Sequence, residues 1–162
     1  MKKCLLSLFI SFNIFCYSQW NNGNISLAQV RSGIEFIDSN HILVAGGQVW
    51  FSASNSSIAS LAHLYDVTSK QSTILTMNTP RLEPTLVRGD SGIYIIGGIS
   101  NGNDVNGNGI YIENTMEIYR DGNFNQVNMP FRTYEAQAIA LNGKIIVAGG
   151  PKYWKWYQNA AD

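Results

Sequence analysis

The chain has 162 residues, of which 45% are hydrophobic and 14% are charged, and its formal net charge at pH 7 is zero. This length suits a single domain, and the balanced charge argues against a protein that binds nucleic acid. The 15 glycines, the 4 prolines and the lack of a long helical pattern favour β structure with many tight turns.

Residues 1–18 are predicted to be an export signal. Residues 1–3 are a basic start, and residues 5–15 are an apolar run that has the length of a signal-peptide core and is too short for a transmembrane helix. Small residues before Gln19 suit cleavage there, which would remove both cysteines and leave a mature chain without disulfides. The alternative is a lipoprotein signal with Cys16 as the lipidated residue. Both interpretations predict an exported protein, periplasmic or extracellular.

The chain then alternates short apolar strands with polar turns. The turn at residues 38–40 joins a first strand to a second, and the second strand ends in the doublet Gly46-Gly47. Two further strands follow the doublet and complete a unit of four. The expected strands of this unit are 32–37, 42–45, 61–66 and 72–75.

The arrangement recurs in full in a second unit, and its first two strands recur in a third. Asn142-Gly143 and Asp121-Gly122 each lie between two strand-like runs, and such pairs are a strong hairpin signal because both turn residues take a positive φ. The expected strands are 85–87, 93–96, 114–119 and 123–127 in the second unit, and 136–140 and 144–148 in the third.

Several markers repeat with one period. The doublets Gly46-Gly47, Gly97-Gly98 and Gly149-Gly150 are 51 and 52 residues apart, and Met77 and Met129, which close the first two units, are 52 residues apart. Such a period indicates an array of one supersecondary unit, and four antiparallel strands per unit are a β-propeller blade. We expect the glycines to mark sharp turns or places where another backbone comes close.

With these features the chain resembles the kelch-repeat family of β-propellers, in its secreted bacterial form. The resemblance rests on the glycine doublets, on Tyr65 and Tyr119 in the third strands, on the closing methionines and on the arginines that follow them. The chain departs from the family on the fourth strand, where Ile74 and Phe124 replace the usual tryptophan. The resemblance implies an all-β fold of four-stranded blades over residues 19–162.

The number of blades is too small for a closed ring. The units span residues 31–77, 81–129 and 132–162, and the third unit lacks its third and fourth strands. This is about two and a half blades, whereas propellers typically have about 4 to 8. We interpret the chain as an incomplete propeller, either the N-terminal part of a longer protein or a truncated product. The alternative is that a complete chain of this length self-associates into a ring.

Arg31, Arg81 and Arg132 each precede the first strand of a unit and are candidate ligand-binding residues. In an antiparallel hairpin the start of the first strand lies beside the end of the second. Each arginine should therefore share a rim with the loop after its doublet, and these loops carry Trp50 and Trp154. Guanidinium groups pair with carboxylates and aromatic faces stack on sugars. The alternative is that the arginines bond to backbone carbonyls between blades.

Two acidic residues begin the first strand in two of the units. Glu83 and Glu135 could face a central channel there as a carboxylate pair. Hydrolysis by two carboxylates needs a fixed separation between them, and the sequence does not establish one.

The loop at residues 100–109 is a weak candidate for calcium. Asp104, Asn106 and Asn108 place oxygens at alternate positions, as in the first half of a calcium-binding loop. The closing bidentate acid would fall on Thr115, which cannot supply it. The alternative is an Asn/Gly loop between strands, and we expect neither a metal nor a cofactor.

These features predict an exported, non-catalytic binding module that presents propeller loops to a protein or a glycan. Kelch-type propellers also include enzymes, and the resemblance leaves as the alternative a fragment of a periplasmic sugar-acting enzyme such as a sialic acid epimerase. The copper-radical sugar oxidases of the family need a tyrosine crosslinked to cysteine, which a mature chain without cysteine cannot supply. No nucleic-acid partner and no transmembrane segment are expected.

Overall fold

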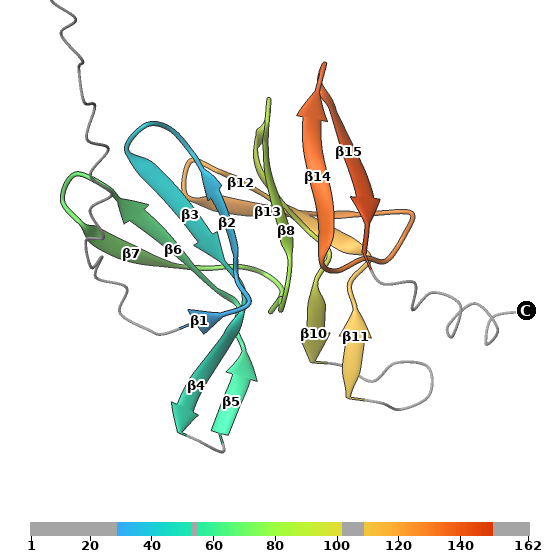
Figure 1. Cartoon of the computed structure of the whole chain (residues 1–162), viewed down its shortest axis with the longest axis horizontal. Helices are drawn as coiled ribbons and strands as arrows, with labels where there is room; N and C mark the ends of the chain where they lie inside the picture. Colours follow the sequence, from blue (N-terminus) through green and yellow to red (C-terminus); the bar gives the residue numbers. More distant parts are fainter. Residues whose placement is uncertain (1–28, 53–54, 102–108, 151–162) are drawn as a thin grey trace, which may run out of the picture.

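The computed structural model describes residues 29–52, 55–101 and 109–150 (Figure 1). Every regular element in these ranges is a β-strand, so the all-β prediction is confirmed. The predicted export signal, residues 1–18, lies outside the described residues.

The strands of the first half of the chain are β1 (Gln29–Val30), β2 (Gly33–Phe36), β3 (His41–Ala45), β4 (Gln48–Ser52), β5 (Asn55–Ile58), β6 (Leu61–Asp66) and β7 (Gln71–Thr76). Those of the second half are β8 (Thr85–Gly89), β9 (Gly92–Ile96), β10 (Ile99–Asn101), β11 (Ile110–Ile112), β12 (Thr115–Arg120), β13 (Asn123–Asn128), β14 (Ala136–Leu141) and β15 (Lys144–Gly149).

Two four-stranded antiparallel sheets form the first two blades. The first has the strand order β2-β3-β6-β7, and the second has the order β8-β9-β12-β13. A third sheet contains β14 and β15, which pair as an antiparallel hairpin. The described part of the chain therefore forms two blades and the first half of a third, as the repeat predicts.

The predicted hairpin turns have the left-handed backbone that they require. Asn142 and Gly143, between β14 and β15, have φ angles of 51° and 71°. Asp121 and Gly122, between β12 and β13, have φ angles of 49° and 83°. Positive φ at both central residues gives a turn whose twist matches that of the strands it joins.

Two ribbons that the sequence analysis did not predict extend from the glycine doublets. After the first doublet β4 pairs with β5, with β1 on the other side of β4, and after the second doublet β10 pairs with β11. Figure 1 shows both ribbons on the same side of the blades. The sequence predicts loops here because these strands are short and their partners carry no matching apolar pattern: β4 is Gln-Val-Trp-Phe-Ser, whereas β5 is Asn-Ser-Ser-Ile.

The hydrophobic core lies between consecutive blades. Leu43 of β3 and Ile95 of β9 are fully buried in a cluster between the first and second blades, which Met77 also joins. Ile96 and Met129 belong to a second cluster, against which residues of β14 and β15 pack. Neighbouring residues of β9 thus belong to different clusters, and the two repeat-marking methionines close equivalent cores.

The doublets bring the backbone of one blade against the next. A Cβ at Gly46 would collide with the carbonyl oxygen of Arg81, and a Cβ at Gly97 would collide with that of Thr133. In each case the second glycine of the doublet donates its N–H to the same carbonyl, at 2.6 Å and 2.8 Å. The first two doublets are therefore sites of close backbone approach, as predicted, and Arg81 and Thr133 occupy equivalent positions.

Candidate functional site

A cavity of about 420 Å³ opens where the first strands of the three sheets begin. β2 contacts β8, and β8 contacts β14, as expected of the innermost strands of neighbouring blades. The cavity lining is made of residues 31–34, 83–86 and 135–137. Each stretch comes from the same place in its repeat, immediately before or within the first strand.

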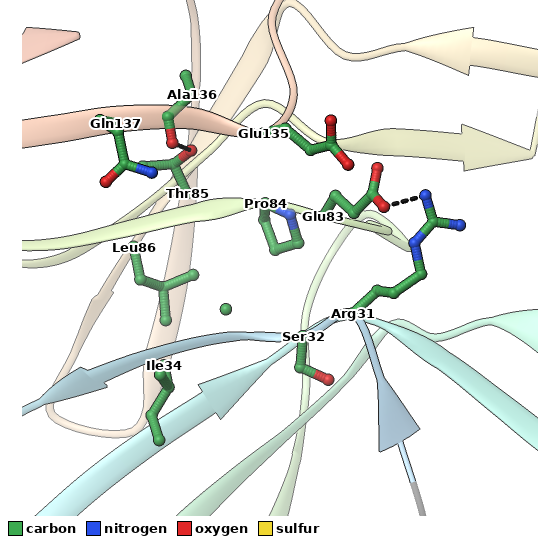
Figure 2. A pocket seen from close by; sticks show the side chains of 11 residues that line it. Arg31, Ser32, Ile34, Glu83, Pro84, Thr85, Leu86, Glu135, Ala136 and Gln137 are labelled. Atoms are coloured by element: carbon green, nitrogen blue, oxygen red, sulfur yellow. Dashed lines mark hydrogen bonds and ion pairs between the residues drawn. The ribbon is translucent and has the colours of Figure 1, made fainter. Parts of the chain in front are cut away.

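One backbone position recurs at this cavity. Arg31, Glu83 and Glu135 are 52 residues apart and have φ angles of 60°, 56° and 48°. The N–H of Glu83 donates to the carbonyl of Arg31 at 3.0 Å, and the N–H of Glu135 donates to the carbonyl of Glu83 at 3.2 Å. The left-handed conformation is unfavourable for residues with a side chain, but here it places three charged side chains in a row (Figure 2).

The three side chains carry an excess of negative charge. Arg31 forms an ion pair with Oε1 of Glu83, and the Arg31 side chain is 50% exposed whereas that of Glu83 is 9% exposed. The second oxygen of Glu83, Oε2, is buried and accepts no hydrogen bond from a described residue. Glu135 is exposed. Within the described ranges, Glu135 forms no ion pair.

Two hydroxyl groups of the lining are committed to the backbone. Thr85 Oγ1 donates to the carbonyl of Ala136 at 2.7 Å, and so joins β8 to β14. Ser32 Oγ donates to the carbonyl of Gly46 at 2.9 Å, and so joins the start of β2 to the end of β3. These two hydrogen bonds join the strands that form the wall of the cavity. Neither His41 nor His63 belongs to its lining. The lining thus offers charged groups, aliphatic groups and the amide of Gln137 for binding.

Arg81 is not available to a ligand. Its side chain is fully buried, with Nη1 donating to the carbonyls of Gly97 and Thr115 at 2.7 Å and 2.9 Å. Its Nε lies 3.3 Å from Oε1 of Glu117, which is also fully buried. Burial lowers the pKa of Arg81, and the nearby charges of Glu117 and Glu113 oppose that shift. For Arg81 the structure supports the alternative stated above, hydrogen bonding to backbone carbonyls between blades.

Arg132 has a different environment from Arg81. It is exposed, and its guanidinium carbon lies 4.5 Å from the ring centroid of Tyr111 on β11. Trp50 lies on β4, in the ribbon after the first doublet. Trp154 lies outside the described residues. Of the four candidate ligand-binding residues that the structure describes, Arg31 is the one in the cavity lining.

The three arginines are not equivalent because their spacings differ from the structural repeat. Arg31 occupies the position of Glu83 and Glu135, each 52 residues from the next. Arg132 precedes Thr133, the residue that corresponds to Arg81, by one position. The exact 52-residue spacing of Glu83 and Glu135 was the sequence signal for this site.

The calcium candidates Asp104, Asn106 and Asn108 lie outside the described residues. No group of three or more potential metal-ligating side chains occurs within residues 29–52, 55–101 and 109–150. In the same ranges, no helix has the length and apolar character needed to cross a membrane.

No protein-family model matches the sequence, and no curated protein matches it. The fold does match solved structures. The structure of YjhT aligns with it at a TM-score of 0.61 and 18% sequence identity, over 85% of this chain and 40% of YjhT. The chain therefore spans less than half the length of YjhT. Together with the blade topology, this likeness shows that the fold is that of a β-propeller.

Proposed function

We propose that the protein is an exported, non-catalytic binding module of the kelch type, which takes a group of a protein or glycan ligand into the cavity between β2, β8 and β14. The observation that carries this proposal is the convergence of Arg31, Glu83 and Glu135 on one cavity. Binding sites are typically concave and largely apolar, with a few polar groups that fix orientation. The aliphatic wall and charged row of this cavity fit that description.

The chemistry of the lining favours binding over catalysis. The hydroxyls of Ser32 and Thr85 donate to backbone carbonyls, and an activated hydroxyl nucleophile needs an adjacent base to accept its proton. Arg31 and Glu83 are paired with one another. Glu135 is exposed and forms no ion pair within the described ranges, so it is the charged group of the lining that is left to bind a ligand.

A direct binding screen of the full chain tests the proposal. The wild type, Glu135→Gln and the control Asp121→Asn are compared on a glycan array and on an array of short peptides. Asp121 is a matched control because it is an acid with a positive φ, 49°, on the distant β12–β13 turn. We expect ligands that bind the wild type and the control equally and Glu135→Gln more weakly. Binding that both variants retain in full would place the ligand elsewhere.

The second candidate function is that of a sugar-acting enzyme, such as a sialic acid epimerase, of which this chain supplies part. Its support is the carboxylate pair, Glu83 and Glu135, in one cavity, together with the kelch-type pattern. Proton NMR of free sialic acid distinguishes the candidates. An interconversion of epimers faster than in protein-free buffer, and lost in Glu135→Gln, would favour the enzyme.

A further inference from the structure

The two ends of the cavity differ in chemistry. Figure 2 shows Ile34 and Leu86 at one end, Glu83 and Glu135 toward the other, and Pro84 between them. All five residues line the same cavity. A ligand that fills the cavity would therefore contact aliphatic side chains at one of its ends and carboxylates at the other.

At the acidic end one guanidinium, that of Arg31, lies beside two carboxylates. Oε1 of Glu83 is paired with Arg31, but the buried Oε2 accepts no hydrogen bond from a described residue, although nine-tenths of the side chain is buried. A buried acceptor without a donor is unfavourable, more so when it is charged. Glu135 is next to Glu83 in the row of equivalent residues and adds a second carboxylate. A donor with positive charge would pair with the exposed carboxylate of Glu135 and neutralise the excess charge.

We propose that the cavity accepts a lysine side chain of a protein partner, with its ammonium group between Glu83 and Glu135. This inference rests on the proposed binding function and specifies its ligand. A lysine has a four-carbon stem that packs on apolar surface while its charged end stays with polar groups. Pro84, Leu86 and Ile34 supply the surface for the stem. An ammonium group has three donors, enough to bond both oxygens of the exposed Glu135 carboxylate beside the negative charge of Glu83.

The lining favours lysine over an amino sugar. A sugar amine is attached directly to a ring that carries several hydroxyl groups, and beside the aliphatic wall of Ile34, Pro84 and Leu86 the lining offers them one amide, that of Gln137. Polar groups buried without partners cost free energy. A lysine stem has no such groups, so it matches both ends of the cavity.

The experiment is an NMR titration of the full chain with capped peptides. The probes are Gly-Gly-Lys-Gly-Gly, the same peptide with norleucine, which keeps the stem without the ammonium group, and glucosamine. We expect the lysine peptide to shift the amide signals of residues 83–86 and 135–137, and the norleucine peptide to bind about tenfold more weakly, the effect of losing one charge-assisted hydrogen bond. Equal binding of the two peptides, or preference for glucosamine, would overturn the inference.

Variants locate the binding and separate the two proposals. Glu135→Gln should weaken binding of the lysine peptide about tenfold, and Asp121→Asn should leave it unchanged. Because Glu135 is exposed, this variant should fold even if Glu83→Gln does not. If the arrays yield a ligand that depends on Glu135 but the lysine peptide does not bind, the lysine inference fails and the binding function stands. If neither binds, both fail.

Discussion

Arg81 and Glu117 form an ion pair that is completely buried between the first two blades, with Nε of Arg81 3.3 Å from Oε1 of Glu117. The carboxylate of Glu117 also accepts hydrogen bonds from the backbone N–H groups of Asn78 and Thr79, both at 2.9 Å. The linker from β7 to β8 is thus tied to β12 of the next blade. Removing one member of such a pair leaves a buried charge without compensation.

Arg81→Ala should therefore destabilise the protein strongly. We expect the free energy of unfolding to fall by about 3–5 kcal/mol, measured by urea denaturation followed by circular dichroism. The control is Arg132→Ala, which removes an exposed guanidinium from the face of Tyr111 and should cost about 0.5–1 kcal/mol. Equal losses for the two variants would contradict the distinct environments of the two arginines.

These two arginines show that the sequence predicts the strands and turns but not the surroundings of an individual side chain. The strands, the period and the hairpin turns were predictable because apolar runs, glycine doublets and Asn-Gly pairs record local requirements of the backbone. The environment of an arginine depends on which backbone of the next blade it meets. Arg132 lies one residue before the position that corresponds to Arg81, and this difference leaves its side chain exposed. The repeat pattern in the sequence looks the same with either position.

The cavity and the ribbons were missed for related reasons. Glu83 and Glu135 were recognised as equivalent, but the place of Arg31 beside them depends on hydrogen bonds between blades. The β10–β11 ribbon pairs Ile99 with Ile112 across a long polar segment. Strand pairing that is distant in sequence leaves little local pattern, since short strands depend on context more than on propensity.

Gly97→Ala should be much more costly than an alanine at an open turn glycine. Gly97 has a φ of 59°, and a Cβ there would meet the backbone of Thr133. We expect a loss of about 1–2 kcal/mol from the left-handed conformation and about 1–3 kcal/mol more from the displaced blade.

Gly122→Ala is the matched control for Gly97→Ala. Gly122 has a φ of 83°, but a Cβ there would have open space around it. This variant should lose the conformational part alone, about 1–2 kcal/mol. Thermal unfolding of the two variants gives the comparison, and similar melting temperatures would show that the doublet is not a site of close backbone approach.

The stability of the protein should fall as the pH drops from about 7 to 5, because of His63. This side chain on β6 is fully buried and neither ring nitrogen has a partner among the described residues. Burial lowers its pKa below the usual 6.5. As the pH falls below 6.5, the unfolded chain takes up the proton before the folded chain does, so unfolding becomes more favourable until the folded pKa is reached.

Two variants separate the titration of His63 from its unpaired polar atoms. His63→Leu and His63→Asn should both reduce the loss of stability between pH 7 and pH 5, measured by urea denaturation at each pH. At pH 8, where histidine is neutral, His63→Leu should be as stable as the wild type or more stable, because it removes buried polar atoms without partners. An unchanged pH dependence in both variants would show that another group is responsible.

The outer face of the third sheet exposes large apolar side chains. Ile139, Leu141 and Ile146 are 58%, 54% and 49% exposed, and Ile139 pairs directly with Ile146. Alternate residues of the same strands, such as Ala138 and Val147, pack against the second blade. A strand with apolar residues on both faces is typical of a sheet that is covered on both sides.

Replacing Ile139 and Leu141 with threonine should therefore reduce self-association of the chain, because exposed apolar patches promote it. Threonine has the β-branched side chain that strands favour, and both positions are exposed, so the stability of the folded chain should change by less than about 0.5 kcal/mol per residue. Sedimentation velocity over a range of concentrations measures the association. The control Ile145→Thr changes the inward face and should instead lower stability by about 1–3 kcal/mol without reducing association. A double variant that associates as strongly as the wild type would mean that this face does not mediate self-association.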